Sequence, residues 1–220
     1  MEPTPRTTVH RLPKRAVYDR ARIDAILDAG MICHIGFVDN GSPCVLPTGY
    51  VRVGDWLYVH GSAASHMLRA LVAGAEACVT VTHLDGLVLA RSAFHHSVNY
   101  RSVVVFGKAR LVAEPREKWD ALRAFTNHVV EGRWEEVRQP NEQELKGTTV
   151  VAIPIDEASA KVRLGPPIDD EEDFAAAVWA GYVPVSLSSG DPIPDARLAP
   201  GAQPPAPERL VLNRAHALPK

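Results

Sequence analysis

The chain of 220 residues lacks the features that define several large classes of protein. It has no apolar run long enough to span a bilayer, so a membrane protein is not expected. Its formal net charge is −2 and it has no long basic run, which argues against nucleic acid or an anionic membrane as a partner. Residues 1–14 are rich in Pro, Thr and Arg without a hydrophobic stretch, so they do not predict a secretory signal.

Cysteine is also scarce. Only Cys33, Cys44 and Cys78 are present, each in an apolar, strand-like run, and there is no Cys-x-x-Cys pair. An odd number of such cysteines indicates free thiols in a reducing compartment, so we expect a cytoplasmic protein without a disulfide framework. The histidines show no spacing typical of a metal site, and no metal is predicted.

What the chain does have is a series of apolar runs separated by turn signals. The pairs Asn40-Gly41, Gly54-Asp55 and Asp85-Gly86 supply the positive φ angles that tight hairpins need. The runs rich in Val, Ile, Leu and Thr predict strands at residues 31–38, 43–53, 56–60, 77–83, 87–91, 102–112 (with a bend at Gly107) and, as the last strand, 148–155. Six or seven antiparallel strands with few helices predict a mainly β protein, a small closed or partly closed barrel.

Helices are predicted at the edges of this sheet. Asp19 is a helix cap, Pro115 opens a later helix, and Asn141 with Glu144 forms a capping box. The pattern dissolves after about Gly165, and Pro and Ala dominate from Gly190 onward. We therefore expect an extended or disordered arm at 1–14, one domain at 15–185, and a Pro/Ala-rich tail at 186–220.

One strand-to-helix junction, at residues 60–71, is a candidate phosphate site. Gly61 allows close approach of a ligand to the backbone, Ser62 is a predicted N-cap, and Ser65 falls in the first turn of the helix. The N–H groups of a first turn and the helix dipole favour an anion. The alternative is that these residues only cap the helix.

Four segments together resemble the pyridoxamine 5'-phosphate oxidase-related family of flavin-binding split barrels, and in particular its nitroimidazole-reductase-like branch. They are residues 31–37 with 43–50, residues 60–71, residues 91–107, and residues 159–167 with 178–181. The resemblance implies a six-stranded antiparallel split β-barrel with peripheral helices. It also implies a homodimer that binds FMN at the subunit interface.

The resemblance further implies which residues bind FMN. A strand would run along the isoalloxazine ring, the junction would hold the phosphate, and a second strand would contribute from the partner subunit or the phosphate side. These three groups are Val45, Leu46, Pro47 and Thr48; His60, Gly61, Ser62 and Ser65; and Tyr100, Arg101 and Ser102.

His66 stands where relatives usually carry Arg or Lys after the second serine. A neutral imidazole stabilises a phosphate less than a guanidinium does, so we expect weaker FMN binding. Because an unperturbed histidine has a pKa of about 6.5, that binding should be tighter at pH 6 than at pH 8.

His95, His96 and Tyr100 are the candidate catalytic residues, as proton donors or ligands for a substrate anion. The alternative for them is a polar strand end with an aromatic residue at the dimer interface. Three hypotheses stay open. The first is an FMN-dependent oxidoreductase acting on a small molecule, the second is a barrel that binds flavin without catalysis or has lost its cofactor, and the third is a split barrel that binds haem or a deazaflavin instead of FMN.

Overall fold

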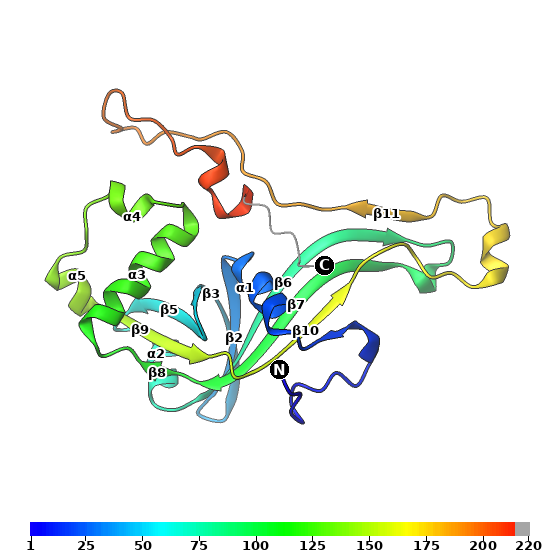
Figure 1. The fold of residues 1–220 in the computed structure, drawn as a ribbon, viewed down its shortest axis with the longest axis horizontal. Coiled ribbons are helices and arrows are strands. Elements are labelled where there is room, and N and C mark those ends of the chain that lie inside the picture. Colours follow the sequence, from blue (N-terminus) through cyan, green and yellow to red (C-terminus); the bar gives the residue numbers. More distant parts are fainter. Residues whose placement is uncertain (214–220) are drawn as a thin grey trace.

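A computed structural model describes residues 1–213 as two antiparallel β-sheets with helices at their edges (Figure 1). The larger sheet has the strand order β1-β10-β7-β6-β2-β3, with β11 also paired to β6, and the smaller has the order β4-β5-β9-β8. The strands are β1 (Ala16–Val17), β2 (Ile32–Asp39), β3 (Ser42–Gly49), β4 (Val51–Val53), β5 (Trp56–Ser62), β6 (Glu76–Leu89), β7 (Ser97–Lys108), β8 (Arg110–Leu111), β9 (Thr148–Pro154), β10 (Glu157–Arg163) and β11 (Gly181–Pro184). The predicted mainly β, antiparallel split barrel is confirmed.

The helices lie around this barrel. They are α1 (Arg20–Asp28), α2 (His66–Val72), α3 (Pro115–Val129), α4 (Arg133–Glu136) and α5 (Glu142–Gly147), with 3₁₀ turns η1 (Pro13–Arg15), η2 (Ala93–His95), η3 (Glu171–Ala175), η4 (Pro207–Arg209) and η5 (Val211–Asn213). None of the helices in the described part of the chain is both long and apolar enough to cross a membrane. The last seven residues of the predicted tail, 214–220, lie outside the described residues.

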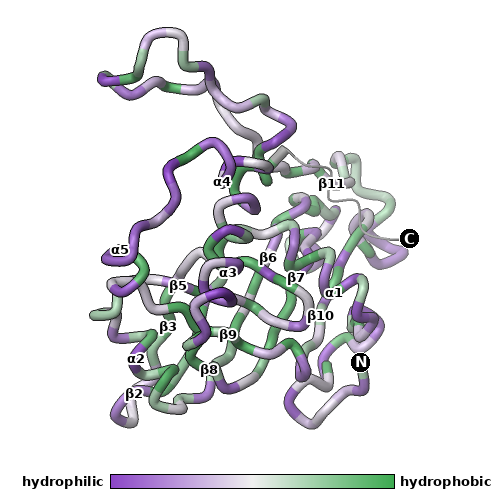
Figure 2. Tube along the Cα trace, turned by 60° about the vertical axis from the view of Figure 1, so that its left-hand side comes forward, coloured by the Kyte–Doolittle hydropathy of each residue, from purple (hydrophilic) through white to green (hydrophobic). Residues whose placement is uncertain are grey.

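The core lies between the two sheets. Alternate residues of facing strands, such as Leu57 on β5, Val105 on β7 and Ile153 on β9, are fully buried in one apolar cluster. The hydropathy of the chain follows this division: the strands β6, β7 and β9 are largely hydrophobic, whereas α4 and α5 are hydrophilic (Figure 2). Burial of these alternating faces is the main force that closes the barrel.

Local signals in the sequence are confirmed where they act within a few residues. Asn40 and Gly41 both have positive φ in the β2–β3 hairpin, and Gly54 has φ 59° between β4 and β5. The Asp19 side chain accepts a hydrogen bond from the backbone N–H of Arg22, and Asn141 with Glu144 forms the predicted capping box.

The hairpin turn predicted at Asp85-Gly86 is wrong. β6 runs through this pair from Glu76 to Leu89, with only a register shift against β7. Gly86 is needed for close approach instead of a turn: a Cβ there would lie 3.1 Å from the backbone oxygen of Val183 on β11. The Asp85 carboxylate pairs with Arg101 on β7, so both residues serve contacts between strands.

Two strand predictions are also corrected. The strand at 148–155 is not the last one, because β10 and β11 follow, and β10 lies inside the larger sheet between β1 and β7. Its small and polar residues hide the strand signal. The run at 102–112 divides after Lys108, and β8 joins the other sheet. Gly107 lies beside this crossing, where a Cβ would come within 3.2 Å of the Pro154 ring.

Part of the chain projects from the barrel (Figure 1). We call this projection the arm and define it as residues 84–98, at the end of the β6–β7 hairpin, with residues 164–187, which include η3 and β11. β11 extends the sheet by pairing with the outer edge of β6. Beyond the arm the chain returns to the barrel, where Leu210 bridges Val130 and the backbone N–H of Glu131 donates to the Arg209 carbonyl.

Candidate functional site

The predicted phosphate junction between β5 and α2 is formed, but with a different cap. Ser65 is the N-cap, and its hydroxyl accepts a hydrogen bond from the backbone N–H of Leu68. The prediction that Ser62 caps the helix is wrong, because β5 continues to Ser62, which pairs with Thr148 on β9. A Cβ at Gly61 would lie 3.3 Å from the Leu68 side chain, so this glycine permits the helix to approach the strand.

Most backbone donors of the junction are used within the protein. The N–H of Ala63 donates to the Gly147 carbonyl, that of Ser65 to the Ser62 carbonyl, and that of Ala64 to the Ser62 hydroxyl. These bonds leave the N–H groups of His66 and Met67, at the start of α2, and the side chains as the polar groups that the junction presents to a ligand.

His66 has a carboxylate partner. Its Nε2 lies 2.9 Å from Oδ2 of Asp39, at the end of β2, and its side chain is 60% exposed. A carboxylate this close repels a phosphate. The pairing therefore adds to the reasons for expecting weak phosphate binding here.

The predicted ring-binding strand forms an apolar edge. β3 is the last strand of the larger sheet. Val45, Leu46 and Pro47 are exposed and Thr48 is half-buried. Ile32 and Val38 on the neighbouring β2 are exposed as well, which extends the apolar surface. A strand edge with apolar side chains suits a flat ligand that also takes backbone hydrogen bonds.

His60, on β5, packs against Phe125 of α3. Its ring contacts Phe125 edge-on, with centroids 4.4 Å apart, and Phe125 also lies against Gly49. Burial lowers the pKa of His60, because the charged imidazolium loses solvation there. His60 is therefore neutral near pH 7 and supplies no cation to this junction.

Arg101 on β7 is neutralised by Asp85. The guanidinium Nε and Nη2 donate to the two carboxylate oxygens at 2.9 and 2.8 Å, while Nη1 is buried without a partner among the described residues. Tyr100 and Ser102, its neighbours in the predicted site, are half-buried.

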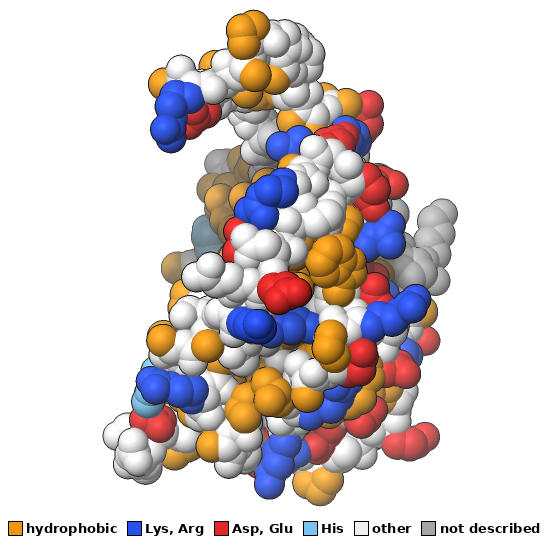
Figure 3. All heavy atoms as spheres, turned by 90° about the vertical axis from the view of Figure 1, so that its left-hand side faces the viewer, with side chains coloured by type: hydrophobic (Ala, Val, Ile, Leu, Met, Phe, Trp, Pro, Cys, Tyr) orange, Lys and Arg blue, Asp and Glu red, His pale blue; other side chains and the backbone are white. Residues whose placement is uncertain are grey.

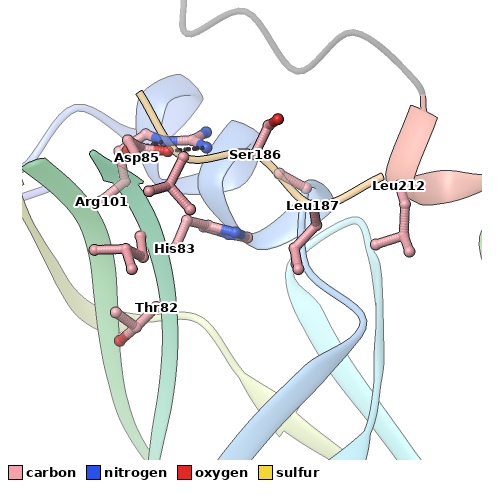
Figure 4. Close-up of a pocket in the computed structure, with 10 residues that line it drawn as sticks. Thr82, His83, Asp85, Arg101, Ser186, Leu187 and Leu212 are labelled. Carbon is pink, nitrogen blue, oxygen red and sulfur yellow. Dashed lines mark hydrogen bonds and ion pairs between the residues drawn. The ribbon is translucent and has the colours of Figure 1, made fainter. Parts of the chain in front are cut away.

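Arg101 also lines a cavity of about 520 Å³ between the barrel and the C-terminal segment, here called the C-terminal pocket (Figure 4). Its walls are Ala29, Thr82, His83, Leu84, Asp85, Arg101, Val185, Ser186, Leu187 and Leu212. His83 donates its Nε2–H to the Ile26 carbonyl at 2.9 Å. Sequence reasoning missed this pocket, because residues about 100 positions apart form it.

The candidate catalytic histidines lie on the arm. His95 pairs through Nε2 with Asp170 at 3.1 Å, and His96 uses Nδ1 to bond the Ser92 carbonyl at 2.9 Å. Possible ligand atoms of His95, Asp170 and Asp173 lie within 4.8 Å of one another, a grouping that sequence spacing did not reveal. In Figure 1 the arm and α2 lie on opposite sides of the barrel. A single chain therefore does not bring the predicted catalytic and phosphate-binding residues together.

The fold and its apolar strand edge define a split barrel of the flavin-binding type. Residues 19–162 match the sequence profile described as pyridoxamine 5'-phosphate oxidase, and the chain belongs to this family. Among curated proteins no sequence matches significantly.

Solved structures extend the match beyond residue 162. The flavocytochrome Anf3 from Azotobacter vinelandii is 43% identical, with a TM-score of 0.87, covering 92% of this chain and 94% of that protein. The FAD and heme binding protein from Mycobacterium smegmatis is 40% identical, with a TM-score of 0.84, covering 89% and 96%. A putative 5-nitroimidazole antibiotic resistance protein from Bacteroides thetaiotaomicron shares the fold at 23% identity and a TM-score of 0.56, covering 67% and 86%.

Proposed function

We propose that the protein binds a flavin and haem, and that it acts as an oxidoreductase on a small molecule. The observation that carries the proposal is the similarity to two proteins whose names state these cofactors, over about nine-tenths of all chains involved. Coverage of this extent must reach past residue 162, where the family profile ends. A bound flavin exchanges two electrons as a hydride and a haem iron exchanges one, so the pair would supply two-electron and one-electron chemistry.

For the flavin we propose FAD, with FMN as the alternative that the family resemblance implied. The relative from Mycobacterium smegmatis is named as an FAD protein. The exposed edge of β3 at Val45, Leu46 and Pro47 fits an isoalloxazine ring. The carboxylate of Asp39 beside His66 disfavours a terminal phosphate at the β5–α2 junction, as in FMN, more than the less charged bridging phosphates of FAD.

We also propose a homodimer. Large apolar side chains are exposed on the β3 edge and along the arm, among them Phe94, Ile168 and Trp179. Large apolar side chains that gather on a surface mark an interaction site.

Purified protein tests this proposal directly. We expect flavin absorption bands and a Soret band, and extraction with chromatography should identify FAD at about one per chain. Extracted FMN would contradict the FAD assignment alone. A protein that retains neither cofactor after incubation with FAD and haemin would overturn the proposed function.

Sedimentation velocity tests the dimer separately. We expect a species of twice the chain mass at micromolar concentration. A monomer at all concentrations, with cofactors bound, would refute the homodimer and leave cofactor binding intact.

A further inference from the structure

Haem iron needs an imidazole nitrogen that points away from the main chain. Nε2 meets this need better than Nδ1, because Nδ1 lies next to Cβ and brings the flat macrocycle against the backbone. In proteins the other ring nitrogen of a ligating histidine usually donates its N–H to a carbonyl or carboxylate, which fixes the tautomer and orients the ring. The hydrogen bonds of each histidine therefore indicate whether it is prepared for iron.

Five of the eight described histidines can be sorted by this criterion, because a hydrogen bond or ion pair engages one of their ring nitrogens. Four of them already use Nε2 in a hydrogen bond or ion pair: His66 with Asp39, His83 with Ile26, His95 with Asp170 and His128 with Gly30. His96 differs from these four in using Nδ1, which lies 2.9 Å from the Ser92 carbonyl. A carbonyl only accepts hydrogen bonds, so Nδ1 of His96 carries the proton and Nε2 keeps its lone pair.

The loop that carries His96 is tied to the second half of the arm. The Asp169 carboxylate accepts the backbone N–H of Arg91 at 3.0 Å and its guanidinium at 2.9 Å, which ties the start of the loop 91–96 to the second half of the arm. The neighbouring His95–Asp170 contact adds a second tie between the same two segments. Such fixed surroundings preorganise a ligand for its metal.

The arm that carries His96 exposes several apolar side chains, next to the acidic residues Asp170 and Asp173 that lie near His95. His96 itself is exposed. Phe94, two residues before it, is 89% exposed, and Leu87, Val98 and Ile168 on the arm are exposed as well. A porphyrin is a flat, largely apolar ligand, so burying it here removes apolar surface of both partners from water.

The comparisons point to the same part of the chain. The two relatives named for haem match about nine-tenths of this chain, whereas the nitroimidazole resistance protein, which shares only the fold, covers 67% of it. The family profile ends at residue 162, before the arm segment 164–187 against which the His96 loop is pinned.

From these observations, and resting on the proposed haem binding, we infer that His96 is an axial ligand of the haem iron through Nε2. Ser92 orients its imidazole, and the apolar arm supplies the surface on which the porphyrin lies. This role replaces the proton-donor role that the sequence suggested for His96.

The test compares full-length His96→Gly with the wild-type protein after reconstitution with haemin. The glycine variant should lose haem on gel filtration. It should release haem to apomyoglobin more than about tenfold faster, since loss of an outer partner alone costs 10–100-fold in metal affinity. Added imidazole should restore the wild-type Soret position, because it fills the vacated coordination site. Flavin content and circular dichroism should not change, which shows that the variant folds.

Matched histidine variants separate the alternatives. His10 is exposed and lies in the N-terminal segment 1–14, far in sequence from the arm. The His10→Gly variant should therefore retain haem like the wild type. Loss of haem in His34→Gly, His60→Gly or His66→Gly, with an unchanged Soret band in His96→Gly, would overturn the inference and leave haem binding intact. A wild-type protein that binds no haem would instead refute the proposed function on which the inference rests.

Discussion

Large apolar side chains are buried in the barrel but exposed on the arm. Leu57, Val105 and Ile153 of the barrel are completely buried, whereas Phe94, Ile168 and Trp179 of the arm are 89%, 74% and 63% exposed. The barrel therefore completes its own core within one chain. The arm presents apolar surface that a single chain does not cover, which is the surface that the proposed cofactor and dimer partner would bury.

The face formed by α3, α4 and α5 differs from the arm in being charged. Where α3, α4 and α5 lie, Lys and Arg side chains are interspersed with Asp and Glu (Figure 3). Ion pairs such as Arg138–Glu144 at 2.6 Å and Arg133–Glu136 at 3.0 Å contribute to this mixed surface. A surface of this composition is typical of one that faces water.

The largest effect is expected in the barrel. Ile153→Ala removes three carbons from a fully buried side chain and should lower the free energy of unfolding by about 2–5 kcal/mol. Denaturant unfolding of the purified protein measures it. A loss below about 1 kcal/mol, which is the effect of an average substitution, would mean that the barrel core is not the main source of stability.

On the arm, Trp179→Ala should act on association and not on unfolding of the chain. A Trp buried at an interface contributes about 2 kcal/mol or more. Its loss should therefore weaken the dimer and raise the dissociation constant by about 30-fold. Sedimentation equilibrium measures the change. The control is Leu198→Ala, in the exposed loop beyond the arm, and equal effects of the two variants would refute a dimer built on the arm.

The connection between the two regions depends on Arg163 at the end of β10. This arginine is 7% exposed, and its guanidinium donates to the Asn99 side chain and to the Pro166 carbonyl, which holds the start of the arm. Arg163→Met should weaken this attachment by about 1–3 kcal/mol, seen as faster hydrogen exchange in β11. Arg197→Met, in the exposed tail, is the control, and unchanged exchange in both variants would show that other contacts hold the arm.

The smallest effect concerns pH and lies inside the barrel. Burial lowers the pKa of His60 below its value in the unfolded chain, so the unfolded state binds more protons as the pH falls. Stability should therefore decrease below about pH 6.5. His60→Gln should flatten this dependence in thermal unfolding between pH 7 and 5, and His10→Gln should not. A steeper slope in His60→Gln would contradict the assignment.

Much of the fold follows from short stretches of sequence. Asn40-Gly41 forms the predicted turn because both residues adopt positive φ angles. Asp19 caps α1 because the backbone N–H that it accepts belongs to Arg22, three residues later. The Asp85-Gly86 pair gave a wrong hairpin, since the same residue types also serve bulges and contacts between strands. The cap at the β5–α2 junction moved from Ser62 to Ser65, because pairing of β5 with β9 extends the strand.

The candidate site was only partly predictable for the same reason. The exposure of Val45 and Pro47 on the β3 edge agrees with the expected ring-binding strand. The partners of His66 and Arg101, by contrast, are Asp39 and Asp85, and neither pairing is marked by sequence spacing.

The sequence by itself determined the family, the alternating burial of the strands and the local turns and caps, because these depend on backbone preferences and nearby side chains. Only the tertiary structure decided that β10 enters the sheet, that the C-terminal segment closes a pocket over His83, and that His96 has Nδ1 protonated. The first two depend on contacts between residues far apart in the chain, which form only once the barrel has folded, and the third depends on how the loop 92–96 brings the Ser92 carbonyl to the His96 ring.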